Sequence, residues 1–482
     1  MDARIIFFLL GRMAFLEGAA LFCAFGLSLF WADEHPLSFG VPAALSFVLW
    51  RVFSHLSNGH RHTIGVTDGA VFLFAAWLLN SLLGALPFFL TGELSAADSF
   101  FASVAAFTTT ALLFTPTGLE SSLGFWQIFQ GWIGGMYFLC LLVTIMPQVG
   151  GCFGLTLSAR QGTNFSPLLR RMSAAARKMA LLYAALTILS LGLFLLAGES
   201  FLSSAVLALT SISTTGLDPR GLVLKGSGVT TELAAEAAML LAGVNFLLWQ
   251  RAAARRDVRT LFLDTELRFF LLVVFLGGAA LACYLAVVGV YDVEHSLRMG
   301  FFHAISFATT TGFAAAPLAS WPTFPHAVLL LLATLGSSVG AVGGGFKAMR
   351  LLVLIKMAKA EVLRTIHPRM IVNVKIDGKS VPHKLHGRIL SFFFLYVVVL
   401  ILATLGLALA HIDTLPAMGF AVGCLSGTGT VVTLLYGGKD FLLLPGWVKV
   451  FAGFLMILGR LEIFSFLILL RAGIDRLHRR QW

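Results

Sequence analysis

The sequence predicts an all-α polytopic membrane protein with two leading transmembrane helices and four pseudo-symmetric units, each with a spanning helix, a short helix and a second spanning helix. Of the 482 residues, 58% are apolar and only 12% are charged, so the chain has too few polar side chains to cover a soluble domain of this size. Long apolar runs recur along the chain, and four short apolar stretches between them end in similar polar tails. These observations argue against a soluble enzyme, a disordered chain and a secreted disulfide scaffold.

Ten apolar runs reach the length of about 20 residues that a bilayer-spanning helix needs. The first run contains Arg4 and Arg12 near its start and has no small-residue cleavage site, so we interpret it as a retained span rather than a signal peptide. In chain order, the runs are 5–31, 36–56, 66–91, 125–148, 177–198, 230–250, 267–290, 323–358, 386–410 and 444–471.

Four further apolar stretches are too short to cross a bilayer and are expected to be re-entrant or buried helices. Each begins near an acidic residue, as helix N-termini favour, and ends in small hydroxylated residues or glycine. The stretches are 97–108, 200–212, 296–308 and 414–426, and their tails end at positions 111, 216, 312 and 429. Their similar spacing predicts a fourfold repeat around a common axis.

The basic residues predict the orientation of the chain in the membrane. If the tails open outward, 28 of the 34 Lys and Arg residues lie in inside loops, five lie outside and Arg460 lies within a span. The positive-inside rule requires this distribution, so we expect a multi-pass protein of the cytoplasmic (inner) membrane with cytosolic basic loops. Because the net charge of +11 is gathered in these loops rather than along one amphipathic face, nucleic acid is not an expected partner.

The repeat divides the chain into six parts. In the predicted cytosolic loop, residues 370–379 alternate apolar and polar side chains and contain an Asp-Gly pair, which predicts a small β-hairpin. The parts are 1–62 with the two leading helices, 63–175 with unit 1, 176–262 with unit 2, 263–358 with unit 3, 359–385 as the cytosolic loop, and 386–482 with unit 4 and the basic C-terminus.

The four tails have the composition of a cation site. Non-helical backbone at membrane depth must be buried in protein or line an aqueous path. The C-terminal end of a helix carries about half a negative elementary charge, and rings of carbonyl groups can replace the hydration shell of an alkali ion. One such tail would be an ordinary polar turn, but four in register predict pore helices around a central ion pore.

Two further features lie within the predicted spans. Residues 336–345 (GSSVGAVGGG) interrupt one apolar run, and their glycines predict an unwound stretch at mid-membrane; close helix packing is the alternative. Arg460 is a functional candidate because an ionisable side chain at that depth is costly, with Glu462 considered as its partner. Glu17 and His303 are expected to pack and form hydrogen bonds rather than to bind ions or protons.

These residues resemble the Trk/Ktr/HKT superfamily of potassium transporters, most closely its bacterial TrkH/TrkG branch. The resemblance covers nearly the whole chain and rests on the four tails, WIGGM (132–136), GSSVGAVGGGFKAMR (336–350), EVLRTIHPR (361–369) and GRLEIF (459–464). It implies potassium uptake through four pore units and a homodimer. It also implies that a cytosolic TrkA-like nucleotide-binding regulatory subunit meets the loop 359–385 and the basic C-terminus, and that K⁺ is transported without a bound cofactor.

The resemblance implies a selectivity filter that binds K⁺. Its residues would be Thr108, Thr109, Thr110, Ala111, Ser213, Thr214, Thr215, Gly216, Thr309, Thr310, Thr311, Gly312, Gly427, Thr428 and Gly429. Ala111 stands where the family has its first filter glycine, and an alanine with positive φ would cost about 1 kcal/mol. A sodium-permeable or weakly selective cation pore is therefore the alternative function.

The resemblance also implies a gate below the filter. The glycine-rich loop would obstruct the path, Lys347 would cap its cytosolic end, and Arg460 would contact the loop carbonyls as an electrostatic barrier. The gate residues would be Gly340, Gly343, Gly344, Gly345, Lys347 and Arg460. A non-conducting membrane scaffold and a membrane-embedded enzyme are the alternatives from other classes, but the spans contain no hydrolase or nucleotide-binding motif, so no enzymatic activity is predicted.

Overall fold

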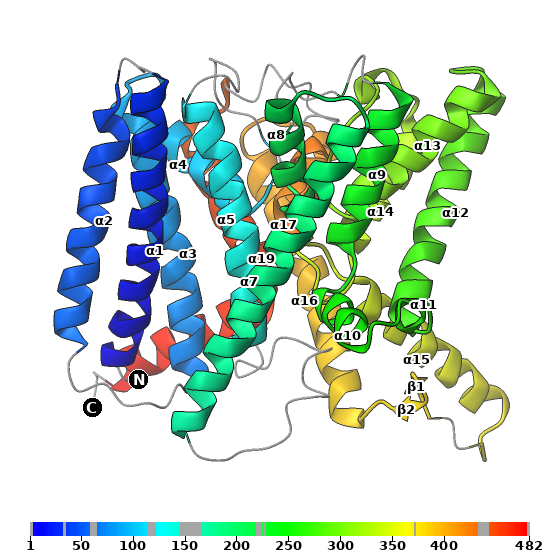
Figure 1. Cartoon of the computed structure of the whole chain (residues 1–482). Coiled ribbons are helices and arrows are strands. Elements are labelled where there is room, and N and C mark those ends of the chain that lie inside the picture. Colours follow the sequence, from blue (N-terminus) through cyan, green and yellow to red (C-terminus); the bar gives the residue numbers. More distant parts are fainter. Residues whose placement is uncertain are drawn as a thin grey trace.

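The structure is a computed structural model that describes residues 3–31, 35–57, 65–110, 112, 122–144, 165–217, 224, 228–370, 373–431 and 443–479. The described chain is almost entirely helical, as predicted (Figure 1). The longer helices that follow the leading pair are α3 (Val66–Leu90), α5 (Ser122–Thr144), α7 (Phe165–Leu196), α9 (Val229–Gly243), α12 (Thr265–Val288), α14 (Thr323–Leu335), α15 (Ala348–Ile366), α16 (His383–Ala408) and α19 (Gly446–Arg479).

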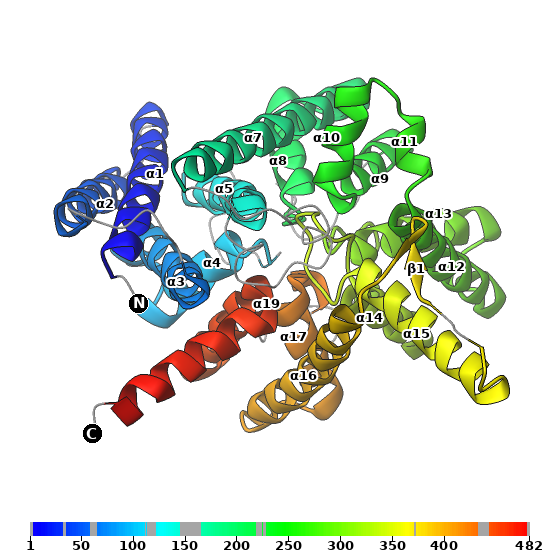
Figure 2. The ribbon, with the colours of Figure 1, turned by 90° about the horizontal axis from the view of Figure 1, so that it is seen from below.

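Two leading helices, α1 (Ala3–Phe30) and α2 (Leu37–Leu56), pack against each other at one edge of the molecule. Figure 2 shows this pair outside the group of helices that surrounds the centre. α1 also contacts α3 and α5, so the pair is attached to one side of the helix group and does not reach its centre.

Four helices of 12 to 16 residues form over the four predicted short stretches and confirm them. They are α4 (Ala96–Phe107), α8 (Phe201–Ile212), α13 (Val293–Ala308) and α17 (Thr414–Ser426). In the view from below, non-helical segments that follow them reach toward the centre of the molecule (Figure 2). The four C-terminal ends therefore lie inside the helix group rather than at its lipid-facing edge.

Within the described ranges, seven helices are long and apolar enough to span a membrane. The bent pair of α9 and α10 (Phe246–Arg255) would make an eighth span. This agrees with a multi-pass membrane protein, in which every backbone group at membrane depth must find a partner inside the protein.

The prediction of a single continuous span over 230–250 is wrong. α9 ends at Gly243, and α10 follows after a bend of 93°. The Asn245 side-chain oxygen accepts a hydrogen bond from Leu247 N at 2.9 Å and so caps the new helix. Phe246 N donates to Gly340 O at 3.1 Å instead of continuing α9. α10 therefore runs across the end of α9.

The predicted interruption of the run 323–358 is confirmed. α14 ends at Leu335 and α15 begins at Ala348, so residues 336–347 form a non-helical loop between them. The last helix, α19, extends past the predicted end at 471 and has one non-helical residue, Glu462, with φ 53° and ψ 125°. That residue breaks the helix two positions after Arg460.

The predicted hairpin is present as β1 (Lys375–Ile376) and β2 (Lys379–Ser380), with Lys375 opposite Ser380 and Ile376 opposite Lys379. Asp377 and Gly378 connect the strands with φ of 46° and 75°. A two-residue turn with positive φ at both positions matches the twist of the paired strands, which explains the Asp-Gly sequence.

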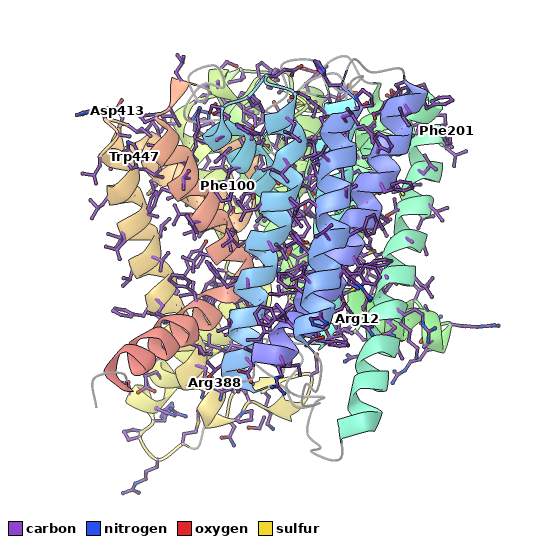
Figure 3. The ribbon with its side chains drawn as sticks, turned by 90° about the vertical axis from the view of Figure 1, so that its left-hand side faces the viewer. Arg12, Phe100, Phe201, Arg388, Asp413 and Trp447 are labelled. Atoms are coloured by element: carbon purple, nitrogen blue, oxygen red, sulfur yellow. The ribbon has the colours of Figure 1, made fainter. Side chains whose placement is uncertain are left out.

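The ends of the molecule differ in charge, as the sequence predicts. The hairpin and the N- and C-termini lie at the same end (Figure 1). Figure 3 places Arg12 and Arg388 toward this end, and Asp413 and Phe201 at the opposite end. The basic segments therefore lie together on one side of the spanning helices.

The interior contains two large clusters of buried apolar side chains. One joins α1, α3, α4, α5, α17 and α19, and the other joins α8, α9, α12, α13 and α14. Because lipid is itself apolar, these clusters stabilise the fold through close packing more than through the hydrophobic effect. Phe107, the last residue of α4, packs on Trp77 and Tyr137 with ring centroids 4.8 and 5.5 Å away, which fixes the end of α4.

Candidate functional site

The four short helices end in the same backbone conformation. After each helix, one N–H donates back to the carbonyl five residues earlier, as in a Schellman cap. These bonds are Thr110 N to Ala105 O at 2.7 Å, Thr215 N to Thr210 O at 2.9 Å, Thr311 N to Ser306 O at 3.0 Å, and Thr428 N to Gly423 O at 3.0 Å. The predicted fourfold repeat is thus present in the backbone and not only in the composition.

The residue before each of these donors has a left-handed backbone. Thr109, Thr214 and Thr310 have φ of 55°, 57° and 59°, and Gly427 at the fourth end has φ of 75°. A β-branched residue in this region is a genuine outlier, and such conformations cost on the order of 1–3 kcal/mol each. Strain repeated at three equivalent positions indicates that these ends serve a function.

A pair of hydroxyl groups closes each helix end. The residue just before the left-handed position and the residue just after it have side-chain oxygens within hydrogen-bond distance. The pairs are Thr108 with Thr110 at 3.0 Å, Ser213 with Thr215 at 2.8 Å, Thr309 with Thr311 at 2.9 Å, and Ser426 with Thr428 at 3.0 Å. Ser426 was not among the predicted residues, although an S-x-T spacing shared with Ser213 and Thr215 could have identified it.

The ends also approach one another. Thr109 Oγ1 lies 3.5 Å from Thr214 Oγ1, and a side-chain carbon built on Gly216 would lie 2.0 Å from Thr311 O. Only glycine therefore allows this approach between the second and third ends. Thr430, just after the fourth end, donates its hydroxyl to Gly312 O. The contacts therefore bring together the described residues of neighbouring tails: the first with the second, the second with the third, and the third with the fourth.

Two predicted positions differ from this regular arrangement. Gly216 and Gly312 have positive φ of 58° and 81°, but Gly429, the corresponding residue at the fourth end, does not. Ala111, the corresponding residue at the first end, lies outside the described residues.

The glycine-rich loop lies directly against the helix ends. Gly344 N donates to Thr310 Oγ1 at 2.9 Å. A side-chain carbon on Gly344 would lie 1.9 Å from Ser426 O, and one on Gly343 would lie 2.5 Å from Thr309 O. Larger residues at Gly344 would clash with backbone atoms, which explains why this part of the loop is glycine.

Arg460 connects the loop to the first helix end. Its Nη1 donates to Val342 O and its Nε donates to Thr108 O, both at 2.5 Å. The guanidinium carbon also lies 5.2 Å from the centroid of the Phe138 ring. The contact with the loop carbonyls was expected; the bond to Thr108 was not, and it places a positive charge beside the four ends.

Lys347 lies at the other end of the loop, as the residue before α15. Its ammonium group donates to Gly343 O and lies 3.5 Å from Ala341 O and 3.4 Å from Ser337 Oγ. The Gly340 carbonyl accepts from Phe246 N, and a side-chain carbon on Gly345 would lie 2.7 Å from Gly336 Cα. All predicted gate residues therefore contact the loop or belong to it.

Two charged groups near the loop, Glu266 and Arg350, were not predicted from the sequence. Glu266, in the first turn of α12, is buried and accepts a hydrogen bond from Val339 N at 2.5 Å. Arg350 forms an ion pair with Glu462 at 2.7 Å. Glu462 is therefore paired with Arg350, while Arg460 donates to Val342 O and Thr108 O instead.

A cavity of about 20 Å³ lies beneath the loop. Its lining includes the basic side chains of Lys347, Arg350 and Arg460 and one acid, Glu462. A cavity of this size accommodates about one water molecule. A hydrated cation would find neither the space nor a favourable potential there.

The two weaker candidates behave differently. His303 is buried, and its Nε2 accepts from Ala315 N at 3.1 Å while Nδ1 lies 2.7 Å from Met299 O. Both ring nitrogens are used by the backbone, which confirms a packing role. Glu17 is also buried, but its Oε1 has no hydrogen-bond partner among the described residues, so the expected helix–helix hydrogen bond is not formed by that oxygen.

Comparisons with known proteins agree with this architecture. The sequence model of the TrkH family, described as "Cation transport protein", matches residues 42–476. The chain is 27% identical to the Trk system potassium uptake protein TrkG of Escherichia coli (strain K12), covering 97% of each chain. It is 30% identical to the Trk system potassium uptake protein TrkH of Halomonas elongata, covering 97% of this chain and 98% of the relative.

A solved structure has the same fold. The crystal structure of the potassium transporter TrkH from Vibrio parahaemolyticus superposes with a TM-score of 0.88 at 25% identity, covering 98% of this chain and 99% of the other. The chain belongs to the TrkH family of cation transport proteins and is a multi-pass membrane transporter, not an enzyme.

Proposed function

We propose that this chain takes up potassium ions across the cytoplasmic membrane through a pore between the four helix ends. One observation carries the proposal. Four equivalent helix C-termini converge, and each has a residue with a left-handed backbone at the matching position and a pair of hydroxyl groups on either side of it. Partial negative charge at these ends attracts a cation, and carbonyl and hydroxyl oxygens replace its water. The names of the relatives favour potassium as this cation.

The membrane potential is sufficient to drive the uptake. An inside-negative potential contributes about 2.3 kcal/mol per elementary charge per 100 mV. The proposed path therefore needs no ATP and no bound cofactor within this chain.

The glycine-rich loop is the proposed gate. It fills the space below the helix ends, and Arg460 bonds to both the loop and the first end. The cavity beneath it is too small for a hydrated ion and has an excess of basic side chains. Opening requires the loop to leave this position, and Arg460 opposes cation passage until it does.

Two partners are part of the proposal: a regulatory subunit on the cytosolic side and a second copy of the chain. The hairpin and the basic C-terminal segment lie on the predicted cytosolic side (Figure 1), where a TrkA-like nucleotide-binding subunit would dock and shift the gate. A second copy of the chain would complete a homodimer. In this proposal the nucleotide binds the regulatory subunit and not this chain. Each copy of the chain forms its own pore from its own four predicted units.

Ion flux tests the pore. The purified chain in liposomes is expected to take up rubidium, a potassium analogue, when an inside-negative potential is applied, and empty liposomes are expected not to. Absence of any alkali-ion flux with the activated regulatory subunit present would favour a non-conducting scaffold instead.

Ala111 provides the test of the alternative function, a sodium-permeable or weakly selective pore. The Ala111→Gly variant restores the glycine of the family pattern, and the potassium-to-sodium permeability ratio is expected to rise. An unchanged ratio would mean that Ala111 does not set the preference. The reversal potential under biionic conditions gives this ratio directly.

The gate has its own test. Replacing Arg460 with Ala, or deleting residues 341–344, is expected to raise rubidium flux because the barrier or the plug is removed. Arg388→Ala is the matched control, since Arg388 is an exposed arginine on α16. Lower or unchanged flux in a stably folded Arg460→Ala protein would contradict the proposed gate.

A further inference from the structure

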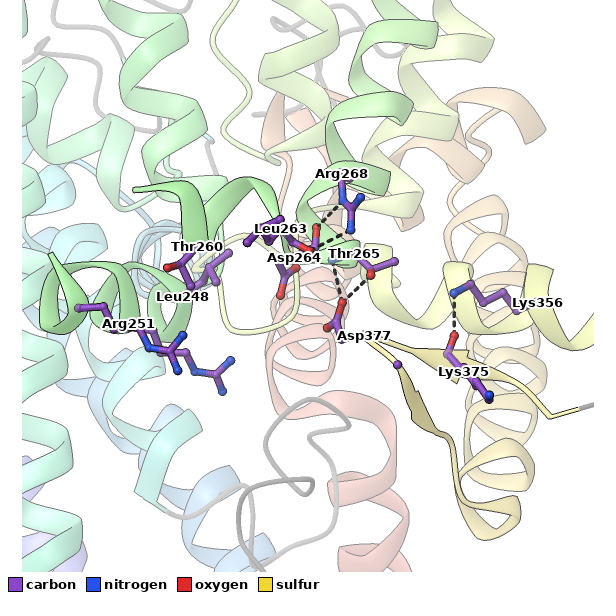
Figure 4. A pocket seen from close by; sticks show the side chains of 12 residues that line it. Leu248, Arg251, Thr260, Leu263, Asp264, Thr265, Arg268, Lys356, Lys375 and Asp377 are labelled. Carbon is purple, nitrogen blue, oxygen red and sulfur yellow. Dashed lines mark hydrogen bonds between the residues drawn. The ribbon is translucent and has the colours of Figure 1, made fainter. Parts of the chain in front are cut away.

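A large basic cleft lies at the predicted cytosolic end of the molecule, away from the four helix ends. It has a volume of about 800 Å³ and is bounded by α10, by the segment that leads into α12, by α15 and by the hairpin (Figure 4). Its polar lining comprises Arg251, Arg255, Thr260, Asp264, Thr265, Arg268, Lys356, Lys375 and Asp377.

The acidic side chains of this cleft are already engaged. Asp377 Oδ1 accepts hydrogen bonds from Thr265 N at 3.1 Å and from Thr265 Oγ1 at 2.5 Å. Asp264 accepts from Leu267 N at 3.0 Å, which caps α12, and burial raises the pKa of its carboxyl group. The five basic side chains therefore outnumber two acids that are held by neutral donors.

Two of the basic groups have no partner of their own. Arg268 donates to Leu263 O at 2.9 Å, and Lys356 donates to Lys375 O at 2.8 Å. Arg251 and Arg255, in contrast, form no side-chain hydrogen bond and no ion pair within 4 Å among the described residues, although the charge of Arg251 acts on the nearby Asp264 and lowers the pKa of its carboxyl group against the effect of burial. They are exposed and lie four positions apart on α10, so they point from one face of the helix. Figure 4 shows Arg251 across Asp377 from Lys356 and Lys375.

The exposed apolar side chain of Leu263 lines the cleft together with these two arginines, and two more exposed apolar residues lie near it in the chain. Val258, Phe262 and Leu263 are between 62% and 70% exposed, on and beside α11 (Arg259–Phe262). The cleft lies where the spanning helices α9 and α12 reach their cytosolic ends. Exposed apolar groups next to exposed basic groups at this depth are typical of a surface inserted at the boundary between headgroups and acyl chains.

We propose that this cleft binds the phosphate headgroup of an anionic phospholipid from the cytoplasmic leaflet. Arg251 and Arg255 hold the phosphate oxygens, since guanidinium groups match phosphate with paired hydrogen bonds. The acyl chains lie against Leu263, the exposed apolar residue of the cleft lining. A soluble phosphate has the same headgroup chemistry, but the apolar border of the cleft favours the lipid. The inference does not depend on the proposed ion transport.

Lipid binding to the full-length protein in detergent tests the site. Native mass spectrometry would count bound phosphatidylglycerol and phosphatidylcholine during a titration. Each basic residue near an anionic surface contributes roughly fivefold in affinity. The double variant R251Q/R255Q is therefore expected to bind phosphatidylglycerol about 25-fold more weakly, with no change for phosphatidylcholine. R251K/R255K is expected to retain an intermediate affinity, because charge remains but paired hydrogen bonding is lost.

The matched control is R177Q/K178Q, which removes two exposed basic residues from α7 on the same predicted side. It is expected to bind phosphatidylglycerol like the native chain. Equal weakening in this control would show diffuse attraction and would overturn the site. Competition by millimolar inorganic phosphate, with no preference for phosphatidylglycerol over phosphatidylcholine, would assign the cleft to a soluble anion and would also overturn the proposal. Loss of phosphatidylglycerol preference in R251Q/R255Q alone would establish it.

Discussion

The four helix ends and the glycine-rich loop lie against each other, but their hydrogen bonds come from different parts of the chain. Each helix end is closed by its own unit: the N–H of Thr311 returns to Ser306 O, and the Thr309 hydroxyl pairs with the Thr311 hydroxyl. The loop takes its partners from far along the sequence. Glu266 is 73 positions from Val339, and Arg460 is 118 positions from Val342.

This difference separates two mechanical roles. The capping bonds of a helix end lie within its own unit, so they do not need to break when neighbouring helices move, although Arg460 and Thr430 add longer-range bonds to the first and third ends. A loop held by α12, α19 and the third helix end moves when any of them is displaced. We therefore expect the ends to act as a fixed site and the loop as the movable part, which agrees with the proposed filter and gate.

The largest expected effect comes from the close approach between the second and third helix ends. Gly216→Ala places a side-chain carbon 2.0 Å from Thr311 O and at positive φ. Left-handed strain of about 1 kcal/mol and overpacking of about 1–3 kcal/mol should lower rubidium uptake by on the order of 100-fold. Uptake by reconstituted protein, with its unfolding temperature, measures this.

Gly192→Ala is the control, since nothing lies within 4 Å of the added carbon. If Gly216→Ala transports like the control, transport does not require the second and third ends to be this close. That result would contradict the role of the helix ends as a fixed site.

The next largest effect should come from a distant bond of the loop. Glu266→Ala leaves the buried Val339 N–H without its acceptor, which costs about 1–3 kcal/mol. The loop should then be less firmly held, so that resting rubidium flux rises while the unfolding temperature falls. Glu266→Gln keeps an acceptor oxygen and should change both quantities less. A Glu266→Ala protein with native flux would show that this bond does not hold the gate.

A smaller effect is expected from the local hydroxyl pairs. Ser426→Ala and Ser213→Ala each remove one hydroxyl of a pair, at about 1 kcal/mol. If every end is closed within its own unit, the two variants should lower the free energy of unfolding equally and leave the gate unaffected. A difference between them of more than about 1 kcal/mol would mean that the fourth end depends on its neighbours.

The smallest expected effect lies at the hairpin. Asp377→Gly fits the positive φ of 46° and removes only the carboxylate that holds Thr265, an exposed contact of about 0.5–1 kcal/mol. Asp377→Asn keeps the acceptor oxygen and should be closer to the native chain. Because Thr265 adjoins Glu266, which bonds to the loop, Asp377→Gly should also raise resting flux slightly. Identical flux in the native chain, Asp377→Gly and Asp377→Asn would show that the hairpin does not influence the gate.

The same contrast explains how much could be predicted from the sequence. The short helices, their polar tails and the Asp-Gly hairpin depend on neighbouring residues, so composition and spacing revealed them. Ser426 could have been found in the same way, but the predicted fourth tail began at Gly427 and so left out its first position. The interruption at 336–345 followed from its glycines alone.

Contacts between distant segments could not be predicted. Nothing near Glu266 in the sequence indicates Val339 as its partner, and the pairing of Glu462 with Arg350 depends on a non-helical residue inside an apolar run. The bend after Gly243 likewise depends on the carbonyl of Gly340, which lies in another unit. In each case the deciding group arrives through tertiary packing, which a pattern within one segment does not contain.

The small cavity beneath the loop bears on whether protons can leak across the membrane. Protons cross water-filled passages by hopping along a chain of molecules, so a pore can block metal ions and still dissipate the proton gradient. If the loop is the gate that we propose, a chamber for about one water, bordered by Lys347, Arg350 and Arg460, would interrupt such a chain and repel the excess proton. In its closed state such a transporter would block protons as well as metal ions.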